Sequence, residues 1–278
     1  DSFEQIDLAR RALKADWITP VYQPKMDLRS GSVAGAEALL RIDHPRIGLQ
    51  GPSAIWGALE AARIGRAIDD RMISLVLEDL AQWSPWAQAL GSVSINMSTE
   101  TLAQPGLARS LLKKLDKKGI ETSQVTIEVT ERVLVDRLSN RTHQALRDLQ
   151  HRGVRVSLDD FGTGFASLTH LQQLPVKEIK IDQTFVRDLR PEGPNAAIVK
   201  SMISLALNMG IDAVAEGVET AGQALLLRQW GCRYAQGYYF HPPLRAHDFA
   251  RLCGIGSDTE VASPASFEHQ IAAALHRR

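Results

Sequence analysis

The stretch that decides the fold is an apolar, strand-like segment that ends in two adjacent acids and a glycine-rich turn: Val154-Arg155-Val156-Ser157-Leu158-Asp159-Asp160-Phe161-Gly162-Thr163-Gly164. Neighbouring carboxylates repel each other, so a cation or bulk solvent has to offset their charge at the end of a strand. The stretch therefore indicates either a divalent-metal site or an ordinary solvated turn, since Asp and Gly are common turn residues.

Around this stretch, short apolar runs alternate with helical patterns. The expected strands are residues 92–97, 124–129, 154–158, 178–181, 211–215 and 234–239. The expected helices are residues 106–118, 140–152, 167–174, 194–209 and 221–229. Alternation of strands and helices at this spacing is typical of βα units that build a mostly parallel sheet.

The chain before this alternation follows a different pattern. Residues 21–28 and 33–40 are predicted strands joined by a turn that contains Gly31, which indicates an antiparallel hairpin. Residues 52–82 predict two helices broken near Gly65. With the hairpin, about eight strands are expected, and this number favours a TIM-like (β/α)8 barrel over an open doubly wound sheet.

Three segments are expected along the chain. Residues 1–17 are interpreted as an N-terminal linker and helix, residues 18–252 as the barrel, and residues 253–278 as a C-terminal linker and helix. The sequence starts with Asp1 rather than Met, which we interpret as a fragment of a longer protein.

Composition excludes several classes of function. The chain of 278 residues has 32 Lys and Arg residues and 32 Asp and Glu residues, so no overall basic field favours DNA. The two cysteines, Cys232 and Cys253, lack the spacing of a zinc ribbon or a disulfide framework, which predicts a reducing, cytoplasmic setting. No apolar run reaches the roughly 18 residues that a membrane span needs, and no charged-then-apolar pattern predicts a signal peptide within these residues.

Polar residues recur at or just beyond the ends of the predicted strands. They are Glu37, Asn96, Glu128, Glu131, Asp159, Asp160, Lys180, Asp182, Glu216, Glu219 and Gln236. In a parallel barrel the carboxyl ends of the strands converge on one face, so these side chains are expected to share one cleft. Each acid alone could instead be a helix N-cap or an exposed loop residue.

The residue types in this set indicate the metal. Carboxylates with an amide oxygen are hard ligands that suit Mg²⁺ or Mn²⁺ and, with suitable geometry, Ca²⁺. Lys180 and Asp182 flank Ile181, so strand alternation predicts that both polar side chains lie on one face. The two residues either form an ion pair with each other or belong to a site that activates a metal-bound water.

Short motifs in a fixed order make the set specific. They are Tyr22-Gln23-Pro24, Glu37-Ala38-Leu39-Leu40-Arg41, Ser94-Ile95-Asn96-Met97-Ser98, Glu128-Val129-Thr130-Glu131, Asp159-Asp160-Phe161-Gly162-Thr163-Gly164, Lys180-Ile181-Asp182, Ala215-Glu216-Gly217-Val218-Glu219 and Gln236-Gly237-Tyr238. Over about residues 18–250 the sequence resembles the EAL domains, the family of bacterial cyclic di-GMP phosphodiesterases.

The resemblance implies a modified (β/α)8 barrel with an antiparallel first strand, and hydrolysis of cyclic di-GMP to linear 5′-pGpG. It also implies two Mg²⁺ or Mn²⁺ ions, held directly or through water. The implied ligands are Glu37, Asn96, Glu128, Asp159, Asp160 and Glu216. Of these, Glu37 and Glu216 also belong to the implied catalytic set, together with Lys180.

Further roles follow from the same resemblance. Lys180 would hold or deprotonate the attacking water, and Arg41 would contact a substrate phosphate. Gln23 and Gln236 would lie near the substrate or water in the cleft.

Three supporting residues are also implied. Glu131 would restrain the loop of residues 160–164, while Asp182 and Glu219 would support the site. A homodimer, and a sensory or cyclase domain elsewhere in the full-length protein, are the expected partners. Departures from the common family pattern occur at Ile42, at Phe165-Ala166 and at Gln183-Thr184, and none of them removes an implied ligand.

Two other functions remain as alternatives. A non-catalytic cyclic di-GMP receptor would be indicated by the loss of ligands such as the first Glu or the Asp pair, and none is lost. A glycosidase with two catalytic carboxylates would need an aromatic platform for the sugar, whereas the tryptophans lie mainly in predicted helices.

Overall fold

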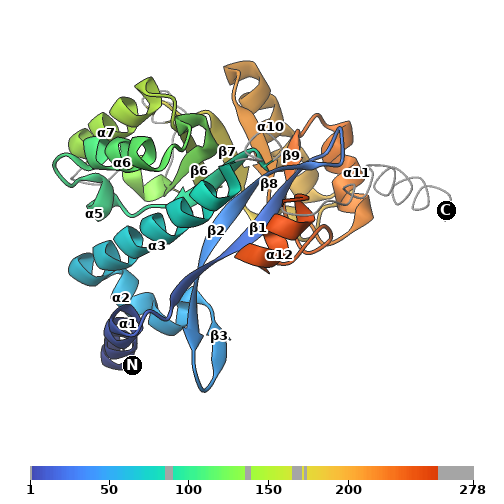
Figure 1. Cartoon of the computed structure of the whole chain (residues 1–278). Helices are drawn as coiled ribbons and strands as arrows, with labels where there is room; N and C mark the ends of the chain where they lie inside the picture. Colours follow the sequence, from blue (N-terminus) through green and yellow to red (C-terminus); the bar gives the residue numbers. More distant parts are fainter. Residues whose placement is uncertain (1, 85–89, 135–138, 165–170, 172–173, 256–278) are drawn as a thin grey trace.

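The strands close into a barrel in the computed structural model, which describes residues 2–84, 90–134, 139–164, 171 and 174–255. The barrel strands are β1 (Ile18–Asp27), β2 (Val33–His44), β4 (Ser92–Asn96), β5 (Val125–Thr130), β6 (Arg155–Phe161), β7 (Glu178–Ile181), β8 (Asp212–Ala215) and β9 (Tyr234–Ala235). They pair in the order β1-β9-β8-β7-β6-β5-β4-β2, and the pairing of β1 with β2 closes the ring. The predicted TIM-like barrel is therefore confirmed (Figure 1).

The first strand runs against both of its neighbours in the barrel, as predicted. β1 is antiparallel to β2 and to β9, whereas every pairing from β2–β4 to β8–β9 is parallel. Two short strands that the sequence did not predict extend the sheet: β3 (Gly48–Gln50) pairs with β2, and β10 (Leu244–Arg245) pairs with β1. The carboxyl ends of β2 and β4–β9 consequently share one end of the barrel.

Helices cover the outside of the barrel (Figure 1). The α-helices are α1 (Ser2–Lys14), α2 (Trp56–Leu59), α3 (Ala62–Trp83), α5 (Thr99–Leu102), α6 (Leu107–Lys118), α7 (Ser139–His151), α9 (Gln183–Val186), α10 (Pro194–Met209), α11 (Ala221–Gln229) and α12 (Ala246–Leu252). Short 3-10 helices are η1 (Pro52–Ile55), η3 (Thr122–Gln124) and η4 (Glu131–Leu134). None of these described helices combines the length and apolar character of a membrane span.

The limits of α10 illustrate how local residues set the ends of a helix. Pro194 occupies the first turn, where its missing N–H costs nothing, and Gly210 ends the helix with a left-handed φ of 67°. The limits predicted for α10 and α11 are both confirmed. The predicted helix at residues 167–174 and the C-terminal linker and helix at residues 253–278 fall largely outside the described residues.

Several predicted boundaries were wrong. Strand β1 begins at Ile18 instead of residue 21, β2 ends at His44 instead of residue 40, and β6 ends at Phe161 instead of residue 158. The break between the first two helices lies before Ala62, not near Gly65, since Gly65 is inside α3. Glycine is needed there for close packing, because a Cβ atom would stand 2.5 Å from the carbonyl oxygen of Leu59. Strand β9 ends at Ala235 instead of residue 239. Beyond it, the chain hydrogen-bonds to Val218 in the loop after β8, through the Gln236 carbonyl and the Tyr239 N–H.

The N-terminal helix belongs to a small second core. Ala9 and Ala12 of α1 are fully buried and pack with Ile18, Ile42 and other apolar residues of β1, β2, α2 and α3. This cluster lies at the end of the long hairpin, beside β3 (Figure 1). The division of the chain into three segments stays a prediction.

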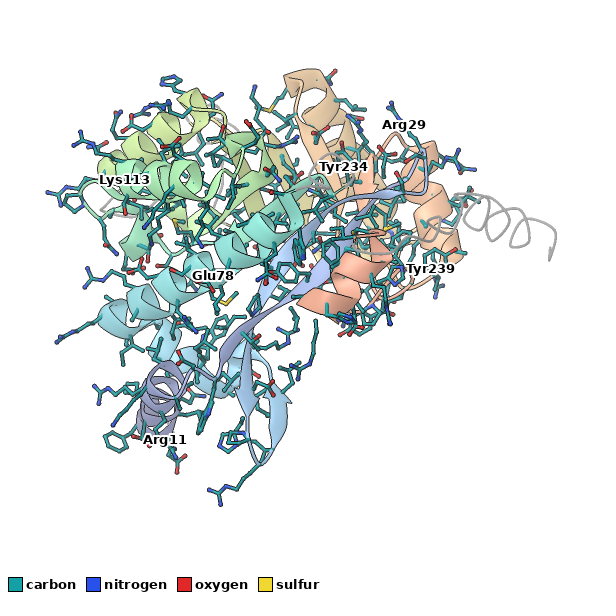
Figure 2. The ribbon with its side chains drawn as sticks, viewed as in Figure 1. Arg11, Arg29, Glu78, Lys113, Tyr234 and Tyr239 are labelled. Atoms are coloured by element: carbon teal, nitrogen blue, oxygen red, sulfur yellow. The ribbon has the colours of Figure 1, made fainter. Side chains whose placement is uncertain are left out.

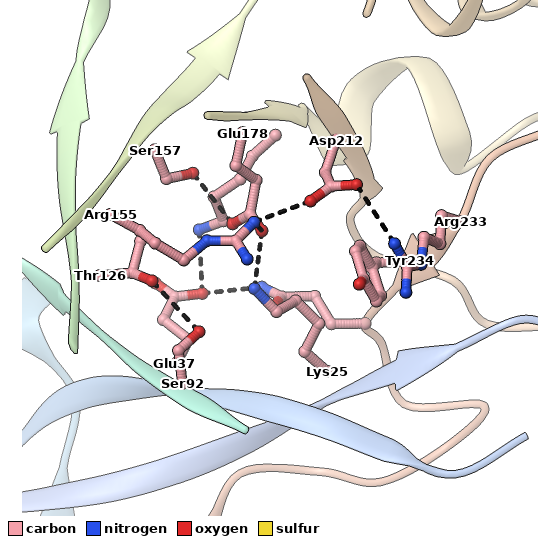
Figure 3. Close-up of polar contacts among 12 residues, drawn as sticks. Lys25, Glu37, Ser92, Thr126, Arg155, Ser157, Glu178, Asp212, Arg233 and Tyr234 are labelled. Carbon is pink, nitrogen blue, oxygen red and sulfur yellow. Dashed lines mark hydrogen bonds and ion pairs between the residues drawn. The ribbon is translucent and has the colours of Figure 1, made fainter. Parts of the chain in front are cut away.

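The interior of the barrel is polar, although aliphatic layers usually fill this space in such barrels. Buried charged side chains come from β1 (Lys25), β2 (Glu37), β5 (Glu128) and β7 (Glu178 and Lys180). They divide into an upper group around Lys180, at the carboxyl ends of the strands, and a lower group around Lys25 and Glu178. Figure 3 shows the lower group.

We predict that Gly91→Ala destabilises the protein more than Gly119→Ala. Both glycines have left-handed φ values, 69° and 67°, so each substitution costs roughly 1 kcal/mol in backbone strain. At Gly91 a Cβ atom would also stand 1.9 Å from the carbonyl oxygen of Ala34, whereas nothing lies within 4 Å at Gly119. This overlap should add about 2 kcal/mol to the loss at Gly91. Equal losses in urea unfolding would contradict the close packing of β2 against the segment before β4.

Candidate active site

Lys180 lies at the centre of the carboxyl end of the barrel. Its side chain is 2% exposed, and its ammonium nitrogen contacts four carboxylates. The distances are 2.8 Å to Glu216, 3.0 Å to Glu37 and to Glu128, and 3.1 Å to Asp159. These acids come from β2, β5, β6 and the residue after β8, so the closure of the barrel brings them together.

The acids form two overlapping groups whose oxygen atoms could each hold a metal ion. Glu37, Glu128 and Asp159 form one group, and Asp159, Asp160 and Glu216 form the other, with ligand atoms within 4.8 Å of one another in each. Asp159 belongs to both groups. The arrangement has the form expected for two neighbouring cations that share a carboxylate.

A backbone irregularity lets two adjacent acids serve this one site. Consecutive residues of a regular strand point to opposite faces, so Asp159 and Asp160 would normally diverge. Asp160 instead has a positive φ of 55°, and the pairing of β6 with β7 shifts register between Leu158 and Phe161. The bulge redirects the Asp160 side chain toward the cluster.

Two amide side chains complete the ring of polar groups. Asn96 Nδ2 donates to Glu37 at 2.9 Å, which leaves its carbonyl oxygen as a possible metal ligand. Gln236 Nε2 donates to Glu37 at 2.7 Å and to Glu216 at 3.0 Å. Both amides therefore position the carboxylates nearest to Lys180.

The electrostatics of the cluster are unbalanced toward negative charge. Burial by itself would raise the pKa of Glu37, but the Lys180 ammonium and the hydrogen bonds from Gln236 and Asn96 lower it to about 2. Burial raises the pKa of Glu216 to about 8, and the neighbouring Asp159 and Glu37 add to this shift against the attraction of Lys180. One lysine therefore cannot hold all of the acids in their charged form.

The pKa values of Asp160 and Lys180 are both raised by the excess of negative charge. Partial burial, followed by repulsion from Asp159 and Asp182, raises the pKa of Asp160 to about 6. Burial would lower the pKa of Lys180, but the four carboxylates outweigh burial and raise it well above its ordinary value. Without other cations, Lys180 is a firmly held ammonium ion and not a base.

Two cavities flank the cluster and share Arg41. A polar cavity of about 380 Å³ is lined by Gln23, Arg41, Lys180, Gln236 and Tyr238, among others. A more apolar cavity of about 470 Å³ is lined by Arg41, Asn96 and Glu128, and by Trp56, Asp69 and Met72 of α2 and α3. These last three residues were not predicted as site residues from the sequence, because they lie on helices and follow no strand-end pattern.

The three predicted supporting residues occupy different positions. Glu131 accepts a hydrogen bond from the Gly162 N–H at 2.8 Å, so it ties η4 to the loop after β6. Asp182 lies beyond the end of β7 and caps α9 by accepting from the Thr184 N–H at 2.9 Å. Glu219 is exposed at the rim of the polar cavity.

Comparison with known proteins places the chain in a family. The EAL domain family model matches residues 7–243. The chain belongs to the EAL domain family. Its Glu37-Ala38-Leu39 motif lies on β2, and Glu37 contacts Lys180 across the barrel.

Several relatives of this EAL domain carry functional names. It is 34% identical to "Cyclic di-GMP phosphodiesterase PA2567" of Pseudomonas aeruginosa, across 81% of this chain and 38% of that protein. It is 33% identical to "Bifunctional diguanylate cyclase/cyclic di-GMP phosphodiesterase MucR" of the same organism, across 87% of this chain and 36% of that protein. The chain thus spans less than two-fifths of these relatives.

Solved structures of EAL domains superpose on this one. The c-di-GMP complex of the PaMucR phosphodiesterase matches with a TM-score of 0.81 and 32% identity, over 88% of this chain and 98% of that one. The FimX EAL domain of Pseudomonas aeruginosa bound to c-di-GMP matches with a TM-score of 0.77 and 25% identity, over 88% and 98%.

We predict that the metal-free EAL domain loses stability as the pH rises from about 5 to 9. Glu216 has a folded pKa of about 8 against an ordinary value of 4.5. Its contribution to stability is therefore complete below pH 4.5 and is lost as the pH rises through 8. Mn²⁺ should remove this loss, because it favours the charged carboxylates.

Urea unfolding at several pH values, in EDTA and in Mn²⁺, measures this effect. Glu216→Gln should flatten the pH dependence in EDTA. Glu219→Gln is the matched control, since Glu219 is exposed at the same cavity and should leave the dependence unchanged. If the free energy of unfolding of the metal-free wild type did not change with pH, the excess of negative charge in the cluster would be contradicted.

Proposed function

We propose that this EAL domain is a metal-dependent phosphodiesterase that hydrolyses cyclic di-GMP to linear 5′-pGpG. The observation that carries the proposal is the convergence of the acids on Lys180, beside two cavities that meet at Arg41. The named phosphodiesterase relatives and the similar domains solved with c-di-GMP support the same substrate.

The donor set fits two divalent cations. The proposed ligands, directly or through water, are Glu37, Asn96, Glu128, Asp159, Asp160 and Glu216. Five carboxylates balance the charge of two divalent ions and one ammonium, which relieves the imbalance described above. Their hard oxygen donors suit Mg²⁺ or Mn²⁺. When bound, such ions polarise a phosphoryl oxygen and lower the pKa of a coordinated water.

Lys180 changes its role when other cations share its counterions. Its raised pKa depends on the four surrounding carboxylates, whereas its burial favours the neutral amine. Metal ions held by those carboxylates would weaken their attraction for the Lys180 proton, so burial would then favour the neutral amine. Lys180 can then hold the attacking water by a hydrogen bond and accept its proton.

Arg41 is proposed to hold a phosphate between the two cavities. Its Nη1 atom donates to the carbonyl oxygen of Leu40 at 2.8 Å, which fixes the half-buried guanidinium and leaves other N–H groups for a ligand. Cyclic di-GMP has two phosphates and two nucleosides, so one nucleoside can enter each cavity. The substrate would then contact Gln23 and Gln236, which both line the polar cavity. Gln23 on β1 lies opposite Glu37 on β2.

The alternative function is a cyclic di-GMP receptor without turnover. The retention of every proposed ligand favours catalysis over this alternative. We further propose that the domain works next to a sensory or cyclase domain, since the relatives are longer and MucR is named as bifunctional. A homodimer is proposed as the active assembly.

We predict that the purified domain converts cyclic di-GMP to 5′-pGpG only with Mg²⁺ or Mn²⁺. Glu37→Gln should reduce turnover at least about a hundredfold, because it removes a charged ligand and a partner of Lys180. Glu78→Gln, on an exposed position of α3 (Figure 2), is the control and should keep full activity. Binding without turnover would favour the receptor, and neither binding nor turnover would reject the proposed substrate.

We predict that Arg41→Gln raises KM by about tenfold or more with a smaller change in kcat. A phosphate contact that is equal in the ground state and the transition state contributes to binding alone. Steady-state kinetics on the variant, with thermal unfolding to check its fold, measures this. A fall in kcat at unchanged KM would show instead that Arg41 acts in the chemical step.

A further inference from the structure

A second buried lysine lies below the acidic cluster. Lys25 of β1 and Glu178 of β7 form an ion pair of 2.8 Å, with side chains 6% and 1% exposed (Figure 3). Lys25 has no other carboxylate within 4.0 Å among the residues that the structure describes. Neither residue belongs to the proposed metal ligands or substrate contacts.

The contacts of Glu178 hold it firmly in place. One of its oxygens accepts from Lys25, and the other accepts from the Ser157 hydroxyl at 3.1 Å. Arg155 lies 4.0 Å from Glu178 and bonds mainly to Asp212, at 2.7 Å. Glu178 therefore has one close cationic partner, Lys25.

The strand register places this pair one interior layer below the proposed metal ligands. Lys25 lies opposite Gly35, two residues before Glu37 on β2. On β7, Glu178 is two residues before Lys180, and both side chains are buried inside the barrel. Solvent screens charges in two adjacent buried layers only weakly. The two layers thus interact electrostatically.

A buried ion pair is a costly way to fill space. Apolar residues of similar volume often stabilise a core as well or better, and aliphatic residues usually fill this layer of a barrel. Unlike apolar residues, each charge of the pair changes the electrostatic potential in the layer above, and the two charges offset each other only while both are present.

We propose that the Lys25–Glu178 ion pair sets the affinity of the acidic cluster for Mg²⁺ or Mn²⁺. The inference rests on the metal site of the proposed function. Glu178→Gln leaves the positive charge of Lys25 beneath the ions and should weaken their binding. Lys25→Met leaves the negative charge of Glu178 and should strengthen it. With both substitutions together, the affinity should return close to the wild-type value.

Calorimetric titration of the metal-free protein with Mn²⁺, without substrate, measures the Kd for the metal and so tests the role of this pair. Each single variant should shift Kd about tenfold, in opposite directions, since a buried unit charge acts on a divalent ion with little screening. Glu178→Asp keeps the charge and should stay near wild type. Arg245→Gln is the matched control, because its ion pair with Asp43 is exposed on both sides, 55% and 43%, and solvent screens it.

Each single variant leaves a buried charge unpaired, so one of them could fail to fold. Arg155→Gln is a further variant for that case, because Arg155 is partly exposed and should tolerate substitution. Removing its positive charge beside Glu178 should strengthen Mn²⁺ binding by about twofold. Weaker binding by both single variants, unchanged binding by both, or weaker binding by Arg155→Gln would overturn the proposal. Wild-type protein that binds Mn²⁺ without hydrolysing cyclic di-GMP would reject the proposed function alone.

Discussion

The contact of the Lys180 ammonium with four carboxylates is the constraint on which the rest of the structure depends. Like charges do not stay together in a protein interior unless an opposite charge and fixed hydrogen bonds hold them. The closed barrel supplies rigid backbone positions from separate strands, and Asn96 and Gln236 fix the carboxylates by donating to them. Even so, one ammonium leaves the cluster short of positive charge, which is the basis for the two cations proposed above.

The local irregularities of the chain occur where this site needs them. Asp160 adopts a left-handed backbone at a bulge, an unusual conformation for a residue other than glycine. It allows two consecutive acids to face one point. Glu131 then holds the following turn through the Gly162 N–H, and a Cβ atom at Gly162 would overlap with Met202 of α10. Departures from local preference of this kind are expected at functional sites.

Much of the fold was predictable because its signals are local. Strand–helix alternation predicted the barrel, a glycine turn predicted the antiparallel hairpin, and Pro194 and Gly210 marked the ends of α10. The polar residues at strand ends included the four acids that converge on Lys180, but also Glu131, Asp182 and Glu219, which occupy other positions. Other features depend on distant contacts. The early end of β9 follows from bonds to Val218, and Lys25 meets Glu178 across 153 positions of sequence, so neither leaves a local pattern.

The most direct test of the account is hydrolysis in water enriched in ¹⁸O, with mass spectrometry of the product. If the cluster around Lys180 directs a water at the phosphorus, each turnover breaks one P–O3′ bond and leaves a single ¹⁸O atom in the 5′-phosphate of pGpG. This labelling should require Mg²⁺ or Mn²⁺. Product without label in the phosphate, or labelled product formed in EDTA, would contradict the proposed use of the site.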